Sequence, residues 1–134
     1  QGCQIDLIVR GNCSLRAGVP GLSENIRVRS ILGRFLEHSR VFRFGSARRG
    51  REHWIGSADW MHRNLDLRVE ALVPIDEPKW RAWLDRLFER LLAPETIAWE
   101  LHMDGRWHRN DGKVDAQTWL QTASPGSDQV TDSR

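Results

Sequence analysis

The sequence is poor in the features that build membrane spans, secretion signals and cross-linked scaffolds. No stretch approaches the ~20 consecutive apolar residues of a membrane-spanning helix, and the N-terminus lacks the order of a signal peptide. The two cysteines, Cys3 and Cys13, can form at most one disulfide and lack the spacing of a structural zinc site. We therefore expect a cytoplasmic protein with reduced thiols and no metal-ligating set, with peripheral membrane association as an alternative.

Lysine is also scarce, because only Lys79 and Lys113 among the 20 basic residues are lysines. Residues 1–74 carry 12 arginines against 7 carboxylates, a net charge of +5, whereas residues 75–134 carry a net charge of −3. Guanidinium groups fork onto carboxylates and phosphates. The first part of the chain is therefore the candidate anion site, and codon bias toward arginine is the alternative explanation of the excess.

The chain has the balance of a globular domain, with 134 residues, 40% of them hydrophobic and 28% charged. The uninterrupted run from Ile5 to Arg10 predicts a strand buried on both faces of a parallel or mixed sheet. A glycine-rich irregular loop follows over residues 11–25, and residues 26–36 are interpreted as a strand passing into a turn of helix. Because the chain begins abruptly before its first strand, we expect a fragment of a longer protein.

Apolar periodicity predicts the remaining elements of an α/β fold. Large apolar residues recur at helical spacing from Pro78 to Leu92, which predicts a helix whose tryptophans pack in the core. The segment from Gly45 to Arg51 is typical of a solvated hairpin loop. Further strands are predicted at residues 41–44, 54–55, 67–74, 96–101 and 106–108. From residue 109 onward the polar composition predicts a disordered tail.

The informative stretches are HSRVFRFG, residues 38–45, and WIGSADWMHRNLDLRVE, residues 54–70. His38 and Arg40 point to the same side of a strand, and a hairpin return brings Ser57 and the Gly56 amide back toward them. An imidazole suits nucleophilic or acid–base chemistry, and arginine and serine are donors to phosphate oxygens. These residues therefore form a candidate oxyanion-binding set.

This set resembles the second half-motif of the phospholipase D superfamily, which runs H-x-K, four residues, D, then G-S-x-N. His38 fits that pattern, Arg40 replaces the lysine, Gly45 stands where the aspartate belongs, and Asp59 replaces the asparagine. The missing aspartate argues against hydrolysis of a phosphodiester. The pattern still predicts a geometry that binds phosphate.

A longer resemblance covers the chain from about Ile5 to Trp99. The runs IDLIVRG, GVPGLSENIRVRSILGRFLEHSR and GSADWMHRNLDLRVE are similar to the last domain of the long bacterial polyphosphate kinases. The resemblance implies a phospholipase D-like mixed β-sheet flanked by helices. It also implies that residues 1–108 are a C-terminal catalytic domain and that residues 109–134 are the tail.

The resemblance also implies roles for individual residues. His38 would contact the nucleotide phosphates and act as general acid or base, and Arg10 and Arg68 would hold the phosphates of ATP. Arg40 and Ser57 would add further phosphate donors. The covalent phosphohistidine of that family lies in a preceding domain and has no match in this chain.

The implied reaction is the reversible transfer of the terminal phosphate of ATP to inorganic polyphosphate, with Mg²⁺ neutralising part of the charge. The implied partners are ATP or ADP, polyphosphate, the remaining domains of the same enzyme and further copies of it, with no nucleic acid. Two alternatives stay open at this point. One is a phospholipase D-type phosphodiesterase, and the other is a non-catalytic module that binds polyanions.

Other conspicuous residues have plainer interpretations. Arg63 is expected to tie a loop to the sheet, and Arg27 and Arg29 lie either on a solvated strand face or along a phosphate tunnel. Surface or packing positions are expected for the remaining histidines, which are His53, His62, His102 and His108. The arginines of the predicted hairpin loop, Arg48, Arg49 and Arg51, are expected to be solvated.

Overall fold

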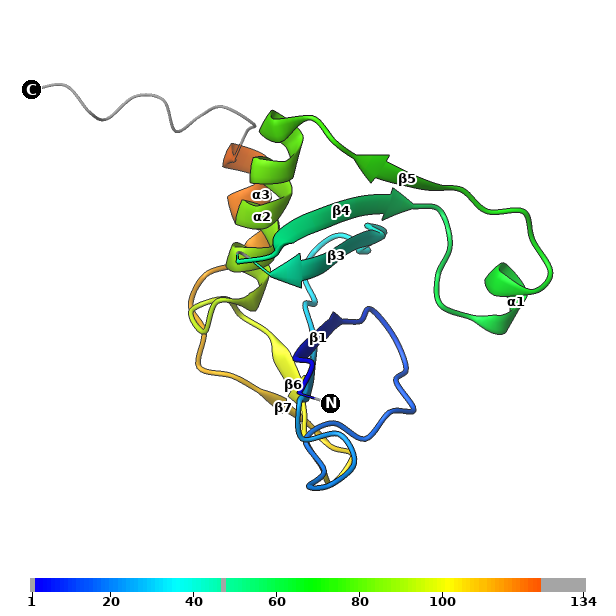
Figure 1. Ribbon diagram of the computed structural model, residues 1–134. Coiled ribbons are helices and arrows are strands. Elements are labelled where there is room, and N and C mark those ends of the chain that lie inside the picture. The colour runs from blue at the N-terminus through cyan, green and yellow to red at the C-terminus, as the bar shows by residue number, and fades with distance from the viewer. Residues whose placement is uncertain (1, 47, 124–134) are drawn as a thin grey trace, which may run out of the picture. The chain divides into compact units, whose positions relative to one another are not determined.

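A computed structural model describes residues 2–46 and 48–123 (Figure 1). The described chain forms two compact units, the first from residues 2–37 and 89–123 and the second from residues 38–46 and 48–88. Helix α2 (Pro78–Leu92) contributes residues to both units. Its bounds coincide with the predicted helix.

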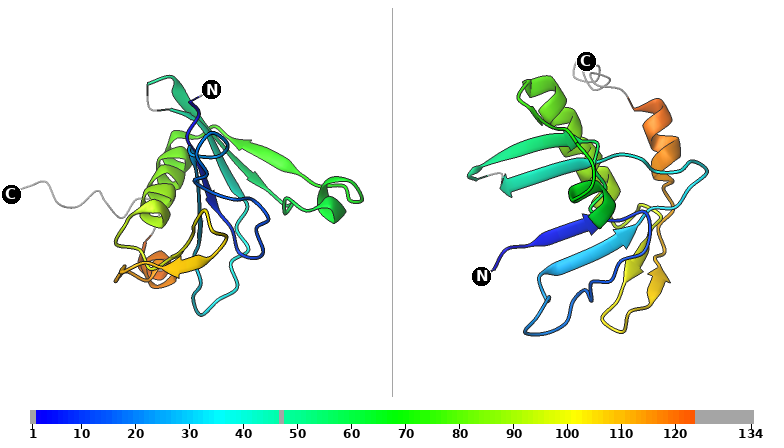
Figure 2. Two further views of the ribbon diagram at one scale, coloured as in Figure 1. Left: turned by 90° about the horizontal axis from the view of Figure 1, so that it is seen from below. Right: turned by 90° about the vertical axis from the view of Figure 1, so that its right-hand side faces the viewer.

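The first unit is built on a mixed four-stranded sheet with the order β1-β2-β6-β7. Its strands are β1 (Ile5–Ile8), β2 (Ile26–Ser30), β6 (Trp99–Leu101) and β7 (Trp107–Arg109). β1 and β2 run parallel with Ile5 opposite Ile26, and the other pairs are antiparallel (Figure 2, right). The predicted mixed sheet and the hairpin of β6 and β7 are therefore confirmed.

Two features of this unit differ from the sequence-based predictions. β1 lies at the edge of the described sheet and Ile5 is 39% exposed, so burial on both faces is wrong for this strand. Residues 31–36 form no helical turn. The segment is irregular, with a bend at Arg34 and Phe35, and its backbone is held by a side chain from elsewhere in the unit, as described below.

The predicted tail contains structure up to the end of the described residues. Helix α3 (Ala116–Thr122) begins after Asp115, whose side chain accepts a hydrogen bond of 2.6 Å from the Thr118 amide. Ala116 is buried and packs with Ile31 and Ala98. The expectation of disorder from residue 109 is therefore wrong through residue 123, and residues 124–134 lie outside the described residues.

The second unit contains the antiparallel sheet β3-β4-β5. Its strands are β3 (Val41–Ser46), β4 (Gly50–Gly56) and β5 (Leu72–Ile75). The predicted hairpin is confirmed, but its turn is tighter, because Gly45 and Gly50 adopt φ of 89° and 88° and Ser46 pairs with Gly50. Arg51 therefore belongs to β4 and not to the loop.

Residues 57–71 connect β4 to β5 through an unpredicted short helix, α1 (His62–Leu65). The strand expected from residue 67 begins only at Leu72. Leu67 and Val69 are exposed, so their alternation with polar residues does not reflect burial on a sheet. This connection carries Ser57, Asp59 and Arg68, three residues of the predicted motif.

Candidate functional site

His38 and Arg40 lie immediately before β3 in the second unit, and their side chains are in direct contact. Arg40 Nη1 lies 2.7 Å from His38 Nδ1 and donates to the His38 carbonyl oxygen at 3.0 Å. Arg40 Nε donates to Asp59 Oδ1 at 3.0 Å. The Arg40 side chain is only 14% exposed, so the structure turns it toward His38 and Asp59.

The hairpin explains why these residues meet. The Gly56 amide donates to the Arg40 carbonyl oxygen at 2.9 Å, which fixes the chain before β3 beside the chain after β4. The turn that follows carries Asp59 back to the Arg40 guanidinium. The two stretches singled out from the sequence are thus brought together by antiparallel pairing, as the hairpin prediction implies.

Ser57 joins the beginning of the connection between β4 and β5 to its end. Its hydroxyl donates to Glu70 Oε2 and accepts from the Ala71 amide at 3.0 Å. Asn64, a buried residue of α1, donates to Glu70 Oε1 at 2.7 Å. Because the Ser57 proton is directed at Glu70, this hydroxyl is not presented as a phosphate donor in the present arrangement.

Glu70 is also the point where two of the predicted arginines act together. The hydrogen bonds from Ser57 and Asn64 hold the pKa of the Glu70 carboxyl below its usual value, and the positive charges of Arg68 and Arg40 lower it further. Arg68 is exposed. The charges of Arg40 and Arg68 therefore both act on one carboxylate, within the unit that also carries His38.

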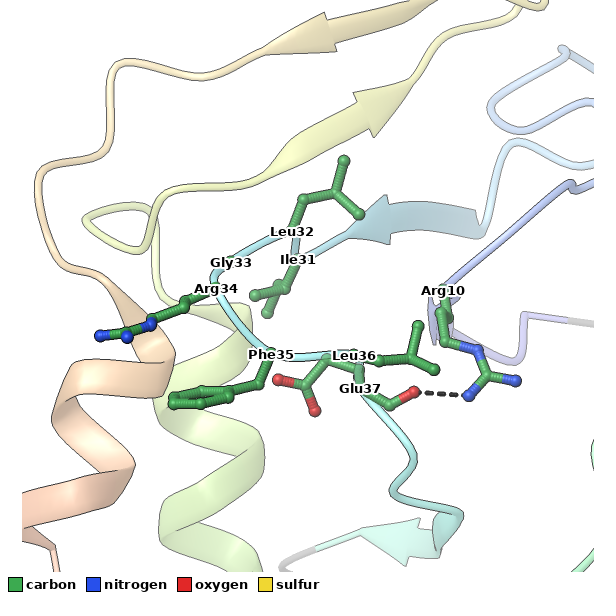
Figure 3. A pocket seen from close by; sticks show the side chains of 8 residues that line it. All are labelled: Arg10, Ile31, Leu32, Gly33, Arg34, Phe35, Leu36 and Glu37. Carbon is green, nitrogen blue, oxygen red and sulfur yellow. Dashed lines mark hydrogen bonds between the residues drawn. The ribbon is translucent and has the colours of Figure 1, made fainter.

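Arg10 belongs to the first unit, where it borders a pocket of about 240 Å³ (Figure 3). The pocket is lined by Arg10 and residues 31–37. Arg10 Nη1 donates to the Glu37 carbonyl oxygen at 2.7 Å. Convergence of Arg10 with His38 and Arg68, which lie in the second unit, stays a prediction.

Gln117 of α3 holds the wall of this pocket. Its amide oxygen accepts from the Phe35 amide at 2.8 Å, and its amide nitrogen donates to the Phe35 carbonyl and to Glu37 Oε1, both at 2.7 Å. A Cβ at Gly33 would lie 2.3 Å from the Gln117 amide oxygen, so any larger residue there would have to displace the Gln117 side chain. Sequence reasoning missed Gln117 because a glutamine in a polar segment carries no signal of burial.

A second polar cluster, centred on Asp85 of α2, packs the helix against the sheet of the second unit. Its Oδ1 contacts His53 Nε2 and Arg43 Nη1 at 3.0 Å and Arg51 Nη1 at 3.2 Å. Burial acts to raise the pKa of Asp85, but the hydrogen bonds from His53 and Arg43 and the charge of Arg51 outweigh it and hold that pKa below its usual value. His53 is thus a packing residue, as expected, whereas Arg51 is not simply solvated.

Gly45 explains why the aspartate of the phospholipase D half-motif has no counterpart here. A Cβ at this position would lie 2.2 Å from the Gly50 carbonyl oxygen, and φ is in the left-handed region. A carboxylate side chain cannot be placed there without rebuilding the hairpin. Within residues 2–46 and 48–123, we also find no group of three or more acidic, histidine or cysteine side chains arranged to hold a metal ion.

Comparison with known proteins places this geometry in a family. The family described as polyphosphate kinase C-terminal domain 2 matches residues 1–121. The polyphosphate kinase of Streptomyces coelicolor is 58% identical over 87% of this chain, and that of Mycobacterium avium is 59% identical over 79%. This chain spans 15% and 14% of the length of those two relatives.

A solved structure agrees with the sequence relatives. The crystal structure of polyphosphate kinase from Porphyromonas gingivalis superposes with a TM-score of 0.76 at 37% identity, covering 90% of this chain and 20% of that one. The phospholipase D-like α/β fold expected from the sequence is thereby confirmed. None of the helices in the described parts of the chain is both long and apolar enough to cross a membrane.

Proposed function

Because this chain belongs to the family described as polyphosphate kinase C-terminal domain 2, we propose that it works as part of a kinase that reversibly transfers the terminal phosphate of ATP to inorganic polyphosphate. The observation that carries the proposal is the exposed His38 imidazole held by Arg40, in the unit that also carries Arg68. Phosphoryl transfer depends mainly on positioning and on neutralising charge on the transferred group. An imidazole held by an arginine is suited to both tasks.

The proposed roles follow the position of each side chain. His38 contacts the nucleotide phosphates and serves as the acid–base group, and Arg68 and Arg10 neutralise phosphate oxygens. Arg40 adds positive charge beside His38. Ser57 is the weakest of the proposed ligands, because a phosphate would have to replace Glu70 as the acceptor of its proton.

The proposal extends to groups outside this chain. The phosphorylated histidine is supplied by another domain of the same enzyme, and the full enzyme is a cytoplasmic homo-oligomer that takes ATP or ADP and polyphosphate. Magnesium would supply further neutralisation of phosphate charge. The described residues offer no cluster suited to Mg²⁺, so we assign none of them to the metal.

The test is a His38→Ala substitution within a full-length polyphosphate kinase that carries these residues. Loss of a positioned acid–base group lowers rates by about 10²–10⁴-fold, so polyphosphate synthesis from ATP should fall at least ~100-fold. His108→Ala is the matched control, because His108 is exposed on β7 in the first unit. Near-normal synthesis by the His38 variant would reject the proposed role.

A further inference from the structure

The contact between Arg40 and His38 also determines which nitrogen of the imidazole carries the proton. A guanidinium group stays protonated in proteins and has no acceptor atom, so Arg40 can only donate. His38 Nδ1, which lies 2.7 Å from Arg40 Nη1, must therefore be the acceptor and carries no proton. In a neutral imidazole, the single proton then resides on Nε2.

The hydrogen-bond inventory of Arg40 is consistent with this assignment. Nη1 carries two hydrogens, and it has two acceptors, His38 Nδ1 and the His38 carbonyl oxygen at 3.0 Å. Asp59 Oδ1 accepts from Nε at 3.0 Å. Asp59 thus orients the plane of the guanidinium group, and the guanidinium group in turn orients the imidazole.

We propose that Asp59 and Arg40 are positioning residues that hold His38 as a neutral imidazole with its proton on Nε2. His38 then donates a hydrogen bond through Nε2 to a phosphoryl oxygen, which narrows the acid–base role proposed above to that of a proton donor at that atom. This inference rests on the proposed function only in naming the acceptor. The tautomer itself follows from the contacts within the second unit.

The chemical consequence of this tautomer is seen by comparison with a histidine that contacts a carboxylate. An imidazole whose Nδ1–H donates to a carboxylate exposes a lone pair at Nε2, which suits nucleophilic attack. Arginine at Nδ1 reverses that polarity. With Arg40 at Nδ1, this histidine presents a hydrogen-bond donor and not a lone pair at Nε2, which suits a domain whose partner supplies the phosphohistidine.

The same unit contains an internal contrast. His62 Nδ1 contacts Asp66 Oδ2, and a carboxylate accepts, so the proton of the neutral His62 ring is on Nδ1. His38 and His62 are both exposed, and both bond through Nδ1. They should nevertheless carry opposite tautomers, because one Nδ1 faces a cation and the other an anion.

The test is nitrogen NMR of the 134-residue chain labelled with ¹⁵N, at mildly alkaline pH. We expect His38 to show a protonated Nε2 and an unprotonated Nδ1, with a scalar coupling across the hydrogen bond to the Arg40 guanidinium nitrogen. His62 should show the reverse protonation. His38→Gln and His62→Gln variants assign the signals, and a proton on His38 Nδ1 would overturn the proposal.

Variants then test the positioning residues. Arg40→Met should abolish the coupling and leave His38 as a mixture of tautomers. Asp59→Asn keeps an oxygen acceptor for Arg40 Nε, so this variant should weaken the coupling only in part. Arg63→Met is the matched control on exposed α1 and should leave the His38 signals unchanged. Unchanged His53 signals show that the unit still folds, because His53 is buried against Asp85. A single unaltered His38 tautomer in Arg40→Met would contradict the proposal.

Kinetics separate this inference from the proposed function. Within the full-length kinase, Arg40→Met should lower kcat about 10–100-fold, as loss of a residue that orients a catalytic group does, with a smaller change in KM for ATP. Arg40→Lys should recover part of kcat, because an ammonium group also donates to Nδ1 but lacks the planar fork that bonds His38 and Asp59 together. If the tautomer is confirmed but the His38→Ala enzyme is active, only the proposed function is refuted. If the tautomer is reversed and the His38→Ala enzyme is inactive, only this inference is refuted.

Discussion

At the scale of single residues, carboxylates pair with the basic groups of the second unit and fix their orientation. Glu70 and Asp85 each attract more than one arginine, and Asp59 orients Arg40. An arginine paired in this way is held in one orientation, since both its charge and its donors are engaged. The excess of arginine in the sequence is therefore divided between structural ion pairs and the exposed groups proposed to bind phosphate.

Asp85 makes the stability of the second unit depend on pH. Its folded-state pKa lies below the ordinary value of 3.8, so the carboxylate stabilises the fold above that value and loses its contribution as the pH falls through the folded-state pKa. Asp85→Asn should lower the free energy of unfolding by about 2 kcal/mol at neutral pH, because the amide oxygen still accepts hydrogen bonds but no longer carries the negative charge beside Arg43 and Arg51.

Urea unfolding at neutral pH and at an acid pH measures this effect, because Asp85 loses its contribution as the pH falls through its folded-state pKa. The gap between wild type and Asp85→Asn should narrow there. Asp76→Asn, at an exposed position before α2, is the control and should be close to neutral. A gap of equal size at both pH values would show that Asp85 acts by packing and not by charge.

At the scale of elements, α3 contributes more to the interior of the first unit than its polar composition suggests. It is seven residues long and contributes Ala116 and Gln117 to the interior of the first unit. Gln117 supplies hydrogen bonds to both backbone groups of Phe35. The conformation of residues 31–37, and hence the wall of the pocket beside Arg10, depends on this helix.

Gln117→Ala should destabilise the first unit by about 2 kcal/mol, because it removes the hydrogen bonds that a buried amide makes to Phe35 and Glu37. Hydrogen exchange at the Phe35 amide should accelerate in the same variant. Gln121→Ala is the matched control, since Gln121 is exposed on the same helix. Equal protection of the Phe35 amide in both variants would show that Gln117 does not hold this segment.

At the scale of the whole molecule, the described chain leaves large apolar side chains uncovered. Phe44 and Leu72 of the β3-β4-β5 sheet are 52% and 54% exposed, and Trp60, which stacks on Phe42, is 73% exposed. Extended apolar surface of this kind commonly marks an interaction site. It fits the proposal that further domains of the same enzyme are partners of a chain that spans 15% of a relative's length.

The proposed polyphosphate partner makes a prediction about salt. A chain of phosphates carries condensed counterions, and arginines that neutralise it release them, so affinity falls steeply as salt increases. Retention of this chain on immobilised polyphosphate should therefore drop sharply between about 50 and 200 mM salt. Arg68→Ala should reduce the slope, with Lys113→Ala in the first unit as control. An affinity that is constant across this range would argue against contacts between arginine and phosphate.

The sequence by itself determined the elements that depend on neighbours in the chain. Apolar spacing predicts α2, and glycines with flanking β-formers predict the β3-β4 hairpin, because helical periodicity and tight turns are local properties. The motif around His38 could likewise be found from residues 38–45 and 54–70. Family resemblance supplied the chemistry expected of it.

Only the tertiary structure decided which partner each polar side chain takes. Gln117 reaches Phe35 across 82 positions, and Asp85 gathers Arg43, Arg51 and His53 from two strands. The direction of Arg40, toward Asp59 and the acceptor nitrogen of His38, is of the same kind. Such choices depend on groups brought together by folding, where burial makes an unpaired charge costly, and no local pattern in the chain records them.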